Sequence, residues 1–473
     1  MTRLTIDPDN INVLTACDAQ RTGGLERLRP QDPIKQFWVQ NWTSTADRFT
    51  WTVEAPEEDD YSVAMVACSH PKIVAGCEGS SSPVEVELAA DRSRLTHEVA
   101  YRDVSPCTQW SRERVHGLLH LRAGANTITL RAVNEPTEGT LNLALLSVEL
   151  TRPDARASLD RAAMALRSDT SWMAEAGYGM FFHWNAAAAP LRGPAKPFEE
   201  AVRDFDVEKF AAMTEQTGAG FVVFTTTWAR YAFPAPIAAI DRIVPGHTTS
   251  RDLPGDLADA LGRRGIRLVL YYHMGHGDAP WWSKQNFESE DKTTFFDNWR
   301  AVISEVGDRY GRKLAGFWFD DAGLAYYPYR APWQELTLAA KTGNADRVVG
   351  YNCWVLPKPT DFQDFYTGEI GLDEAESIPF LPAGGTGRFT GGPQEGLQAT
   401  VCGTMEPGDW THTSPNTALP EPMFDAERMT REYRSAVERK LVPIMNMSIS
   451  QEGEVSPRTL DLFQAVRKDI KGR

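Results

Sequence analysis

Two adjacent carboxylates follow a short apolar run in the second half of the chain. Residues 314–319 read Leu-Ala-Gly-Phe-Trp-Phe without a charge, and Asp320 and Asp321 come next. An uncharged run of this length is typical of a strand buried on both faces of a parallel sheet. Active sites of α/β barrels lie at the C-terminal ends of their strands, so an acid here is a candidate catalytic group. The alternative is that either carboxylate only caps the next element or marks a turn.

Three residues with metal-binding side chains follow another apolar run. His273, His276 and Asp278 lie within six residues after the run 266–272. Zinc and manganese accept imidazole and carboxylate ligands, so this spacing allows a metal-dependent barrel hydrolase. The first predicted barrel strand, however, offers a single histidine, His183, and no His-x-His pair. We therefore expect no metal and no other cofactor, and we keep the metal-dependent hydrolase as an alternative.

The elements that must position these residues alternate between strand and helix from about residue 160 onward. Asp206 and Gly218 are suited to cap the two ends of a helix, and Ser456-Pro457 is a helix start. Apolar runs predict barrel strands at 178–184, 221–225, 266–272, 314–320, 347–352, 398–404 and 441–448. This alternation predicts a (β/α)8 TIM-like barrel over residues 160–473. The glycine-rich stretch 384–392 lacks the Lys-Ser/Thr of a phosphate loop, and we interpret it as an active-site loop.

In the N-terminal third of the chain, the apolar residues recur with a different period, that of a β-strand. Apolar and polar residues alternate in short runs separated by turn signals, at 49–53, 61–68, 117–121, 127–133 and 141–150. This pattern predicts an all-β sandwich over residues 1–151, followed by a linker at 152–159. Residues 121–130 resemble the late strands of jelly-roll carbohydrate-binding modules. Whether such a domain binds sugar or only supports its neighbour is not decided by its fold.

Size and composition narrow the class of protein. A chain of 473 residues exceeds what one hydrophobic core usually supports, which favours two domains. Its 64 acidic and 49 basic residues give a net charge of −15, which disfavours nucleic acid and anionic membranes as partners. The 14 tryptophans suit a ring-shaped ligand such as a sugar, although most must fill core.

The sequence shows no targeting signal or membrane-spanning run, which predicts a soluble protein. The N-terminal residues lack the apolar stretch of a signal peptide, and no run approaches 18 apolar residues. We expect a cytoplasmic protein unless a leader was removed, and a homo-oligomer is compatible with the sequence. The six cysteines are too few and too scattered for a disulfide scaffold. One or two disulfides are compatible with the four in the first quarter of the chain, which are Cys17, Cys68, Cys77 and Cys107. The other two are Cys353 and Cys402.

Several motifs, in order along the barrel, resemble the α-L-fucosidases of glycoside hydrolase family 29. Residues 178–184, Tyr-Gly-Met-Phe-Phe-His-Trp, resemble the first strand of that family. Residues 317–320, Phe-Trp-Phe-Asp, resemble its Trp-Phe-Asp-Gly, whose aspartate is the nucleophile. Residues 364–369, Asp-Phe-Tyr-Thr-Gly-Glu, resemble its Asp-Phe-x-Thr-x-Glu, whose glutamate is the acid/base in several members. Val-Cys-Gly-Thr at 401–404 and Ile-Met-Asn at 444–446 continue the order.

The resemblance implies a retaining exo-glycosidase that works by double displacement. One carboxylate must be ionised to attack the anomeric carbon, and the other must hold a proton for the leaving oxygen. We assign these roles to Asp320 and Glu369, and the aromatic setting of Glu369 (Phe365, Tyr366) suits a raised pKa. Retention requires the two carboxyl groups to lie roughly 5–5.5 Å apart. Three other acids compete for the second role: Asp321, Glu395 and Glu406.

The motifs also depart from the family where the sugar is held. The two family histidines after the second strand are replaced by 227–231, Thr-Trp-Ala-Arg-Tyr, and the family arginine is absent from 352–354, Asn-Cys-Trp. A site that pairs particular hydroxyls rejects a sugar that lacks them, so the substrate is expected to differ from plain L-fucose. The lost histidines also allow a catalytically inactive carbohydrate-binding protein.

The expected partner is a small-molecule, oligosaccharide or glycoconjugate substrate. His183 is expected to donate to a substrate hydroxyl, Arg230 to meet an anionic group or a hydroxyl, and the aromatic residues to wall the sugar. The predicted substrate-binding residues are His183, Trp184, Trp228, Arg230, Tyr272, His273, Asp321, Trp354 and Trp410.

Overall fold

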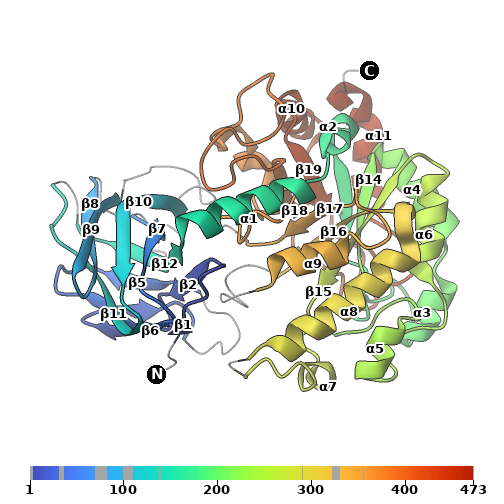
Figure 1. Cartoon of the computed structure of the whole chain (residues 1–473). Coiled ribbons are helices and arrows are strands. Elements are labelled where there is room, and N and C mark those ends of the chain that lie inside the picture. Colours follow the sequence, from blue (N-terminus) through green and yellow to red (C-terminus); the bar gives the residue numbers. More distant parts are fainter. Residues whose placement is uncertain are drawn as a thin grey trace.

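The chain folds into a β-rich N-terminal domain and a larger domain of strands and helices (Figure 1). The computed structural model describes residues 4–30, 37–69, 82–99, 110–137, 140–228, 230–289, 291–321, 331–354 and 356–471. In this described part of the chain, no helix combines the length and the apolar character needed to span a bilayer.

Two six-stranded sheets form the N-terminal domain. The first has the order β1-β6-β11-β8-β9 with β3 on β6, and the second has the order β10-β7-β12-β5-β4 with β2 on β12. One hydrophobic cluster takes side chains from both sheets, and residues of β6 alternate between buried and less buried. The strands are β1 (Leu4–Thr5), β2 (Asn12–Thr15), β3 (Gln20–Thr22), β4 (Glu26–Arg27), β5 (Val39–Trp42), β6 (Arg48–Ala55), β7 (Asp59–Cys68), β8 (Val84–Ala90), β9 (Ser93–Val99), β10 (Trp110–Leu121), β11 (Gly124–Ala132) and β12 (Leu143–Thr151).

The predicted β-rich domain is therefore present, while the jelly-roll topology stays a prediction. Cys17 and Cys68 carry free thiols, so neither forms a disulfide. The other two cysteines of the first quarter, Cys77 and Cys107, lie outside the described residues.

A curled parallel sheet is the centre of the second domain. Its seven strands in the described residues have the order β17-β16-β15-β14-β13-β19-β18. The predicted strand positions agree with the observed ones to within about two residues. These strands are β13 (Gly179–Phe182), β14 (Phe221–Thr225), β15 (Arg267–His273), β16 (Leu314–Asp320), β17 (Val348–Tyr351), β18 (Thr400–Thr404) and β19 (Val442–Asn446). The sheet fits a TIM-like domain, as predicted.

An irregular segment, residues 364–370, lies between β17 and β18. The Asp364 amide donates to Val349 of β17 at 2.7 Å, and the Cys402 amide of β18 donates to Ile370 at 3.1 Å. Phe365 belongs to the same apolar cluster as inward residues of the strands. Segment 364–370 thus connects the two edge strands without forming a regular ladder of its own.

A buried ion pair anchors the start of this segment. Lys341 lies 3.1 Å from Asp364, and both side chains are almost fully buried. The other Asp364 oxygen accepts from the Ser168 amide at 2.7 Å, and the Val349 amide donates to the carboxylate at 2.8 Å. Because a buried charge is stable only when paired and hydrogen-bonded, these contacts fix where segment 364–370 begins.

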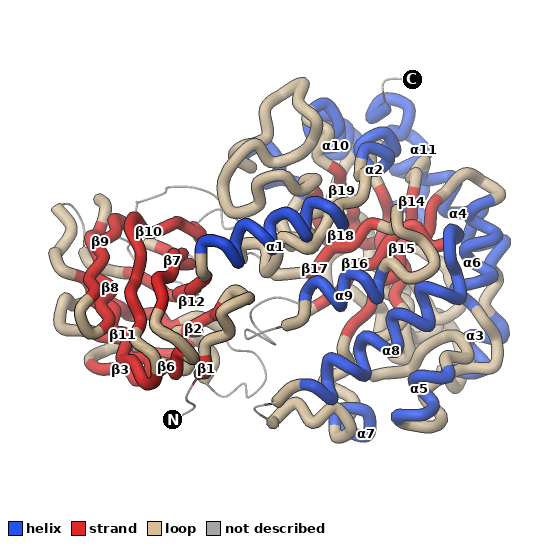
Figure 2. Tube along the Cα trace, viewed as in Figure 1, coloured by secondary structure: helices blue, strands red, loops and turns tan. Residues whose placement is uncertain are grey.

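Helices surround the parallel sheet (Figure 2). Helix α4 begins and ends as predicted: the Asp206 side chain accepts from the Lys209 amide, and Gly218 closes the helix with a φ of 81°. The helices are α1 (Pro153–Leu166), α2 (Ser171–Ala176), α3 (Phe198–Asp204), α4 (Val207–Thr217), α5 (Ala238–Ile243), α6 (Leu253–Gly262), α7 (Ala279–Trp282), α8 (Thr293–Tyr310), α9 (Trp333–Ala340), α10 (Ala426–Glu438) and α11 (Pro457–Lys471), with 3₁₀ turns η2 (Gly311–Lys313) and η3 (Leu372–Ser377).

The predicted linker at 152–159 is wrong, because these residues enter helix α1. Pro153 occupies the first turn, where its missing N–H costs nothing, and Asp154 faces the positive end of the helix. Arg156 of α1 pairs with Asp361 of the second domain at 2.8 Å. The two domains are therefore joined by a docked helix (Figure 1).

The interpretation of residues 384–392 as an active-site loop is also wrong. The Gly387 carbonyl accepts from the Ala399 amide just before β18, and a Cβ on Gly387 would meet Lys440 just before β19. Both contacts lie at the N-terminal ends of parallel strands, opposite the ends that carry Asp320. Composition alone could not tell the two ends apart.

Candidate active site

The side chain of Asp320 lies at the end of β16 and is held by its two neighbouring strands. The Tyr271 hydroxyl of β15 donates to one carboxylate oxygen at 2.5 Å. The Asn352 amide, which directly follows β17, donates to the other oxygen at 2.7 Å. Parallel register places His273 beside Asp320 and Tyr351 beside Phe319, so these side chains reach the same edge of the sheet. The first candidate acid is thus fixed in orientation.

A second acid meets Asp320 through the same amide group. The Asn352 Nδ2 also donates to Glu369 Oε1, at 2.9 Å. The Asp320 and Glu369 oxygens both accept a hydrogen bond from this nitrogen. The distance between them therefore cannot exceed the sum of the two hydrogen-bond lengths, about 5.6 Å. Retaining glycosidases space their carboxyl groups at about 5–5.5 Å, and inverting enzymes at about 6.5–9.5 Å. The Asp320 and Glu369 oxygens that share Asn352 therefore lie closer together than the inverting spacing.

The surroundings of Asp320 favour its ionised form. Burial raises the pKa of this carboxyl, but the nearby His273 imidazole and the hydrogen bonds from Tyr271 and Asn352 outweigh burial, so the pKa lies below its usual value. Burial and the adjacent Asp320 charge raise the pKa of the Tyr271 hydroxyl well above 10, so it stays protonated and donating. An ionised, oriented carboxylate is the form that can attack an electrophilic carbon.

His183 directly follows β13 and lies near Asp320, but its available nitrogen is an acceptor. Asn446 Nδ2 donates to the Trp410 carbonyl at 3.0 Å, so Asn446 Oδ1 faces His183 Nδ1 at 2.8 Å and accepts its proton. Burial lowers the pKa of His183 to about 4, so the ring is neutral near pH 7 and Nε2 carries a lone pair. The predicted donor role is corrected: His183 is suited to accept from a hydroxyl.

Two tryptophans lie around His183, as the apolar-wall prediction requires. The ring centroids of Trp228 and Trp410 lie 4.8 Å and 5.0 Å from the imidazole. Both rings are only partly buried, so each has a face that a ligand can reach. Arg230 is exposed on the loop after β14, and its contact with a substrate stays a prediction.

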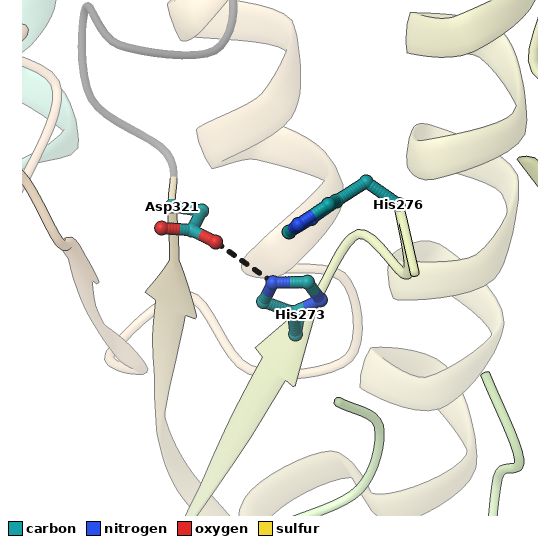
Figure 3. Close-up of side chains that lie close together, drawn as sticks. All are labelled: His273, His276 and Asp321. Carbon is teal, nitrogen blue, oxygen red and sulfur yellow. Dashed lines mark hydrogen bonds and ion pairs between the residues drawn. The ribbon is translucent and has the colours of Figure 1, made fainter. Parts of the chain in front are cut away.

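The histidine cluster after β15 uses a different acid from the expected one (Figure 3). His273, His276 and Asp321 bring ligand atoms within 4.8 Å of one another. Asp278 instead caps helix α7 and accepts from the Trp281 amide at 3.1 Å. The reason is the backbone at Asp321, whose φ of 55° turns the chain out of β16 and toward His273.

The proton positions on His273 do not suit a metal ligand. The Gly275 amide donates to Nδ1 at 2.9 Å, so Nδ1 is an acceptor and Nε2 is the nitrogen that donates to Asp321, at 2.8 Å. A metal-bound histidine normally donates its second N–H to a neighbour, and here that second nitrogen receives one. This pair is better suited to orienting Asp321 than to binding zinc or manganese.

Two predicted substrate contacts face the wrong side of the sheet. Tyr272 bonds to Tyr231 at 2.6 Å, and its ring stacks with Trp299 of helix α8. Trp184 is 1% exposed, and its indole donates to the Gln451 carbonyl and packs against Phe205. Side chains alternate along a strand, so His273 and Tyr272 cannot share a face. Tyr271, two residues before His273, is the one that enters the site.

Sequence reasoning also missed Asn352. Its signal was present: it is the last residue of the predicted strand 347–352 and the first of the tripeptide in which the family arginine was sought. Trp354, expected to wall the sugar, lies in the domain contact, where its ring stacks with Trp38 at 6.1 Å. A single sequence does not reveal such contacts between distant segments.

The two competing acids outside the β16 end have other positions. Glu395 is exposed and lies beyond the N-terminal end of β18. Glu406 is 3% exposed, and its carboxyl accepts from the Ser448 amide at 2.9 Å and the Thr459 hydroxyl at 2.5 Å. Burial raises the pKa of Glu406 to about 7. Glu406 thus links β18 to helix α11 as a structural group.

We expect Glu406 to make stability fall with rising pH. Its pKa is higher in the folded than in the unfolded protein, so its contribution is complete below about pH 4.5 and is lost as the pH passes about 7. A shift of this size is worth about 3 kcal/mol at most. Urea unfolding at pH 5 and pH 8 should show this loss in the wild type and a smaller one in Glu406→Gln. Equal losses in both proteins would contradict the assignment.

Fold and site together define a barrel with paired carboxylates at the C-terminal edge of its strands. The family model for alpha-L-fucosidase matches residues 194–377. Tissue alpha-L-fucosidase from Homo sapiens is 26% identical over 162 residues, which cover 27% of this chain and 34% of that protein. The protein of the same name from Macaca fascicularis is 27% identical over the same lengths. The chain spans about a third of the length of these curated relatives.

Two solved structures are similar to this chain, and the first of them supports the fold. An endo-fucoidan hydrolase from glycoside hydrolase family 107 has a TM-score of 0.50 at 13% identity, over 64% of this chain and 54% of that one. An alpha-L-fucosidase from Lactobacillus casei with alpha-L-fucose product has a TM-score of 0.43 at 16% identity, over 64% and 98%. The resemblance seen in the motifs is confirmed by the family match, which covers residues 194–377 within the second domain.

Proposed function

We propose that the protein is a retaining exo-glycosidase of the alpha-L-fucosidase type. The observation that carries this proposal is the single Asn352 amide group that donates to both Asp320 and Glu369. It keeps the two carboxyl groups at the separation that double displacement needs. In this proposal segment 364–370 takes the place of the sixth strand of an eight-stranded barrel, so that Glu369 reaches the same edge of the sheet as Asp320.

Each half-reaction uses both acids. In the first, a carboxylate oxygen of Asp320 bonds to the anomeric carbon while the bond to the leaving oxygen breaks, and Glu369 gives that oxygen its proton. In the second, Glu369 takes a proton from water, the water oxygen bonds to the anomeric carbon, and the bond to Asp320 breaks. The sugar leaves with its original configuration because the anomeric carbon is inverted twice.

Neighbouring groups orient the reacting carboxylate and the sugar. Tyr271 and Asn352 each occupy one oxygen of Asp320 with a donor, which lowers its pKa and fixes the direction of attack. His183 offers Nε2 as an acceptor, so it suits a sugar hydroxyl that points at it. Trp228 and Trp410 suit the apolar face of the sugar ring.

The sugar is proposed to differ from plain L-fucose or to be bound differently. The loop after β14 offers Trp228 and Arg230 where the family has two histidines, so hydroxyl pairing there is replaced by an apolar wall and a cation. L-fucose and L-galactose, which differ only at C5, are the first candidates.

A panel of aryl glycosides tests this proposal. We expect hydrolysis of an α-L-fucoside or α-L-galactoside above that of β-D-galactosides and arabinosides, and proton NMR should detect the α-anomer of the sugar first. Early appearance of the β-anomer would contradict retention. Binding of the sugars without hydrolysis of any member of the panel would favour the inactive carbohydrate-binding alternative.

A further inference from the structure

The N-terminal domain touches the second domain directly beside the two acids. Phe37 and Trp38, which immediately precede β5, pack on Trp354 with ring centroids 6.0 Å and 6.1 Å away. Trp38 is fully buried and also packs on Trp110 of β10, with ring centroids 5.0 Å apart. The side of this contact that faces Trp354 is therefore packed against the sheet of the N-terminal domain.

The backbone of Trp354 forms hydrogen bonds with both Asn352 and Glu369. Its amide donates to Asn352 Oδ1 at 3.0 Å, and its carbonyl accepts from the Glu369 amide at 3.3 Å. Asn352 in turn donates its Nδ2 to the Glu369 carboxylate. Trp354 thus sets the rotation of the Asn352 side chain and the position of the Glu369 backbone.

The backbone of Trp354 is in a conformation that needs outside support. Its φ of 56° lies in the left-handed region, which a bulky side chain rarely adopts. Such a conformation persists only where the surrounding structure holds it. The stacked ring of Trp38 and the edge of Phe37 pack against the Trp354 side chain, and both come from the other domain.

We propose that the N-terminal domain is part of the catalytic apparatus, and that Trp38 is a positioning residue which keeps Glu369 in place through Trp354. This inference rests on the proposed role of Glu369 as acid/base. It gives the N-terminal domain a function that needs no sugar bound to that domain.

The Trp38→Ala variant tests the inference by its rates on two substrates whose leaving groups differ in their need for a proton. A displaced proton donor slows cleavage only where the leaving oxygen needs a proton. We expect kcat/KM for a phenyl glycoside to fall by about 10–100-fold, while kcat/KM for the 2,4-dinitrophenyl glycoside changes less than about 3-fold. Trp354→Gly, which removes the barrel side of the contact and leaves the N-terminal domain intact, should give the same selective loss.

Two controls separate positioning from folding. Trp38→Phe keeps a ring on Trp354 and should retain the phenyl glycosidase activity. Trp51→Ala removes a buried tryptophan of the same domain that bonds to Thr15 and makes no ring contact with Trp354 in the described structure. It should not change the ratio between the two substrates. Equal losses on both substrates in Trp38→Ala and Trp354→Gly would overturn the inference.

A structural measurement keeps the inference distinct from the proposed activity. In a crystal structure of Trp38→Ala, the Asn352 Nδ2 to Glu369 Oε1 distance, 2.9 Å in the native protein, should exceed hydrogen-bonding range. The distance should be unchanged in Trp51→Ala. An unchanged distance in Trp38→Ala would overturn the positioning role even if no fucoside proved to be a substrate, and a broken one would support it without any turnover.

Discussion

Asp320→Asn is expected to lower kcat on an aryl α-L-fucoside by about 10⁴-fold, the scale on which removal of one member of a catalytic unit acts. An amide cannot form the glycosyl ester, but it keeps the shape of the carboxylate: its oxygen can accept from Asn352, and its NH2 can donate to the Tyr271 hydroxyl oxygen. The fold should therefore be preserved. Initial rates, with thermal unfolding as a check on folding, measure the effect.

The adjacent acid provides a matched control. Asp321→Asn changes the same chemistry one residue later, where the side chain bonds to His273 and not to Tyr271 or Asn352. We expect a loss at least about 100-fold smaller than for Asp320→Asn, because only an orienting contact is changed. Comparable turnover in Asp320→Asn and the wild type would remove Asp320 from the mechanism.

Glu369→Ala is expected to lower kcat/KM for a phenyl α-L-fucoside by about 10²–10⁴-fold, the usual contribution of a general acid. For the 2,4-dinitrophenyl substrate kcat/KM should stay near the wild-type value, because its leaving group needs no proton, whereas kcat should fall because water then attacks the glycosyl ester without a base. Added azide should restore turnover and yield the α-L-fucosyl azide, since azide attacks the glycosyl ester without help from a base.

Glu395→Gln serves as its control, because that exposed acid lies at the opposite end of the barrel strands. It should leave both substrates unaffected. If Glu369→Ala slowed the two substrates equally and did not respond to azide, the acid/base would have to be sought elsewhere, with Asp321 as the next candidate.

The parallel sheet and the position of Asp320 at its edge could be predicted because they depend on local pattern. An apolar run such as 314–319 can only be satisfied inside a sheet with both faces covered, and its final acid must then lie at an edge. Asp206 and Gly218 bounded helix α4 because capping depends on a few adjacent residues. These features need no knowledge of distant contacts.

The wrong residues within correct strands had a different cause. Tyr272 and Trp184 were selected for their chemistry, although strand alternation puts each on the face opposite to the neighbouring histidine. Counting in steps of two from His273 would have selected Tyr271. The error lay in not applying the period of the strand to the choice of side chain.

Contacts between distant segments could not be predicted from one sequence. The pairing of Trp354 with Trp38 joins residues from separate domains, and Asn352 reaches Glu369 only because an irregular segment enters the barrel wall. A segment without a regular ladder has no periodic signal, so neither its position nor the amide that links the two acids was foreseen.

Segment 364–370 carries Glu369 on a part of the wall that has few ladder bonds, while Asp320 lies within the regular sheet. Insertions, deletions or substitutions between β17 and β18 can therefore move one acid without disturbing the other. Under the proposed function, changes confined to this stretch would alter how the departing group is protonated while the attacking carboxylate keeps its support in the regular sheet.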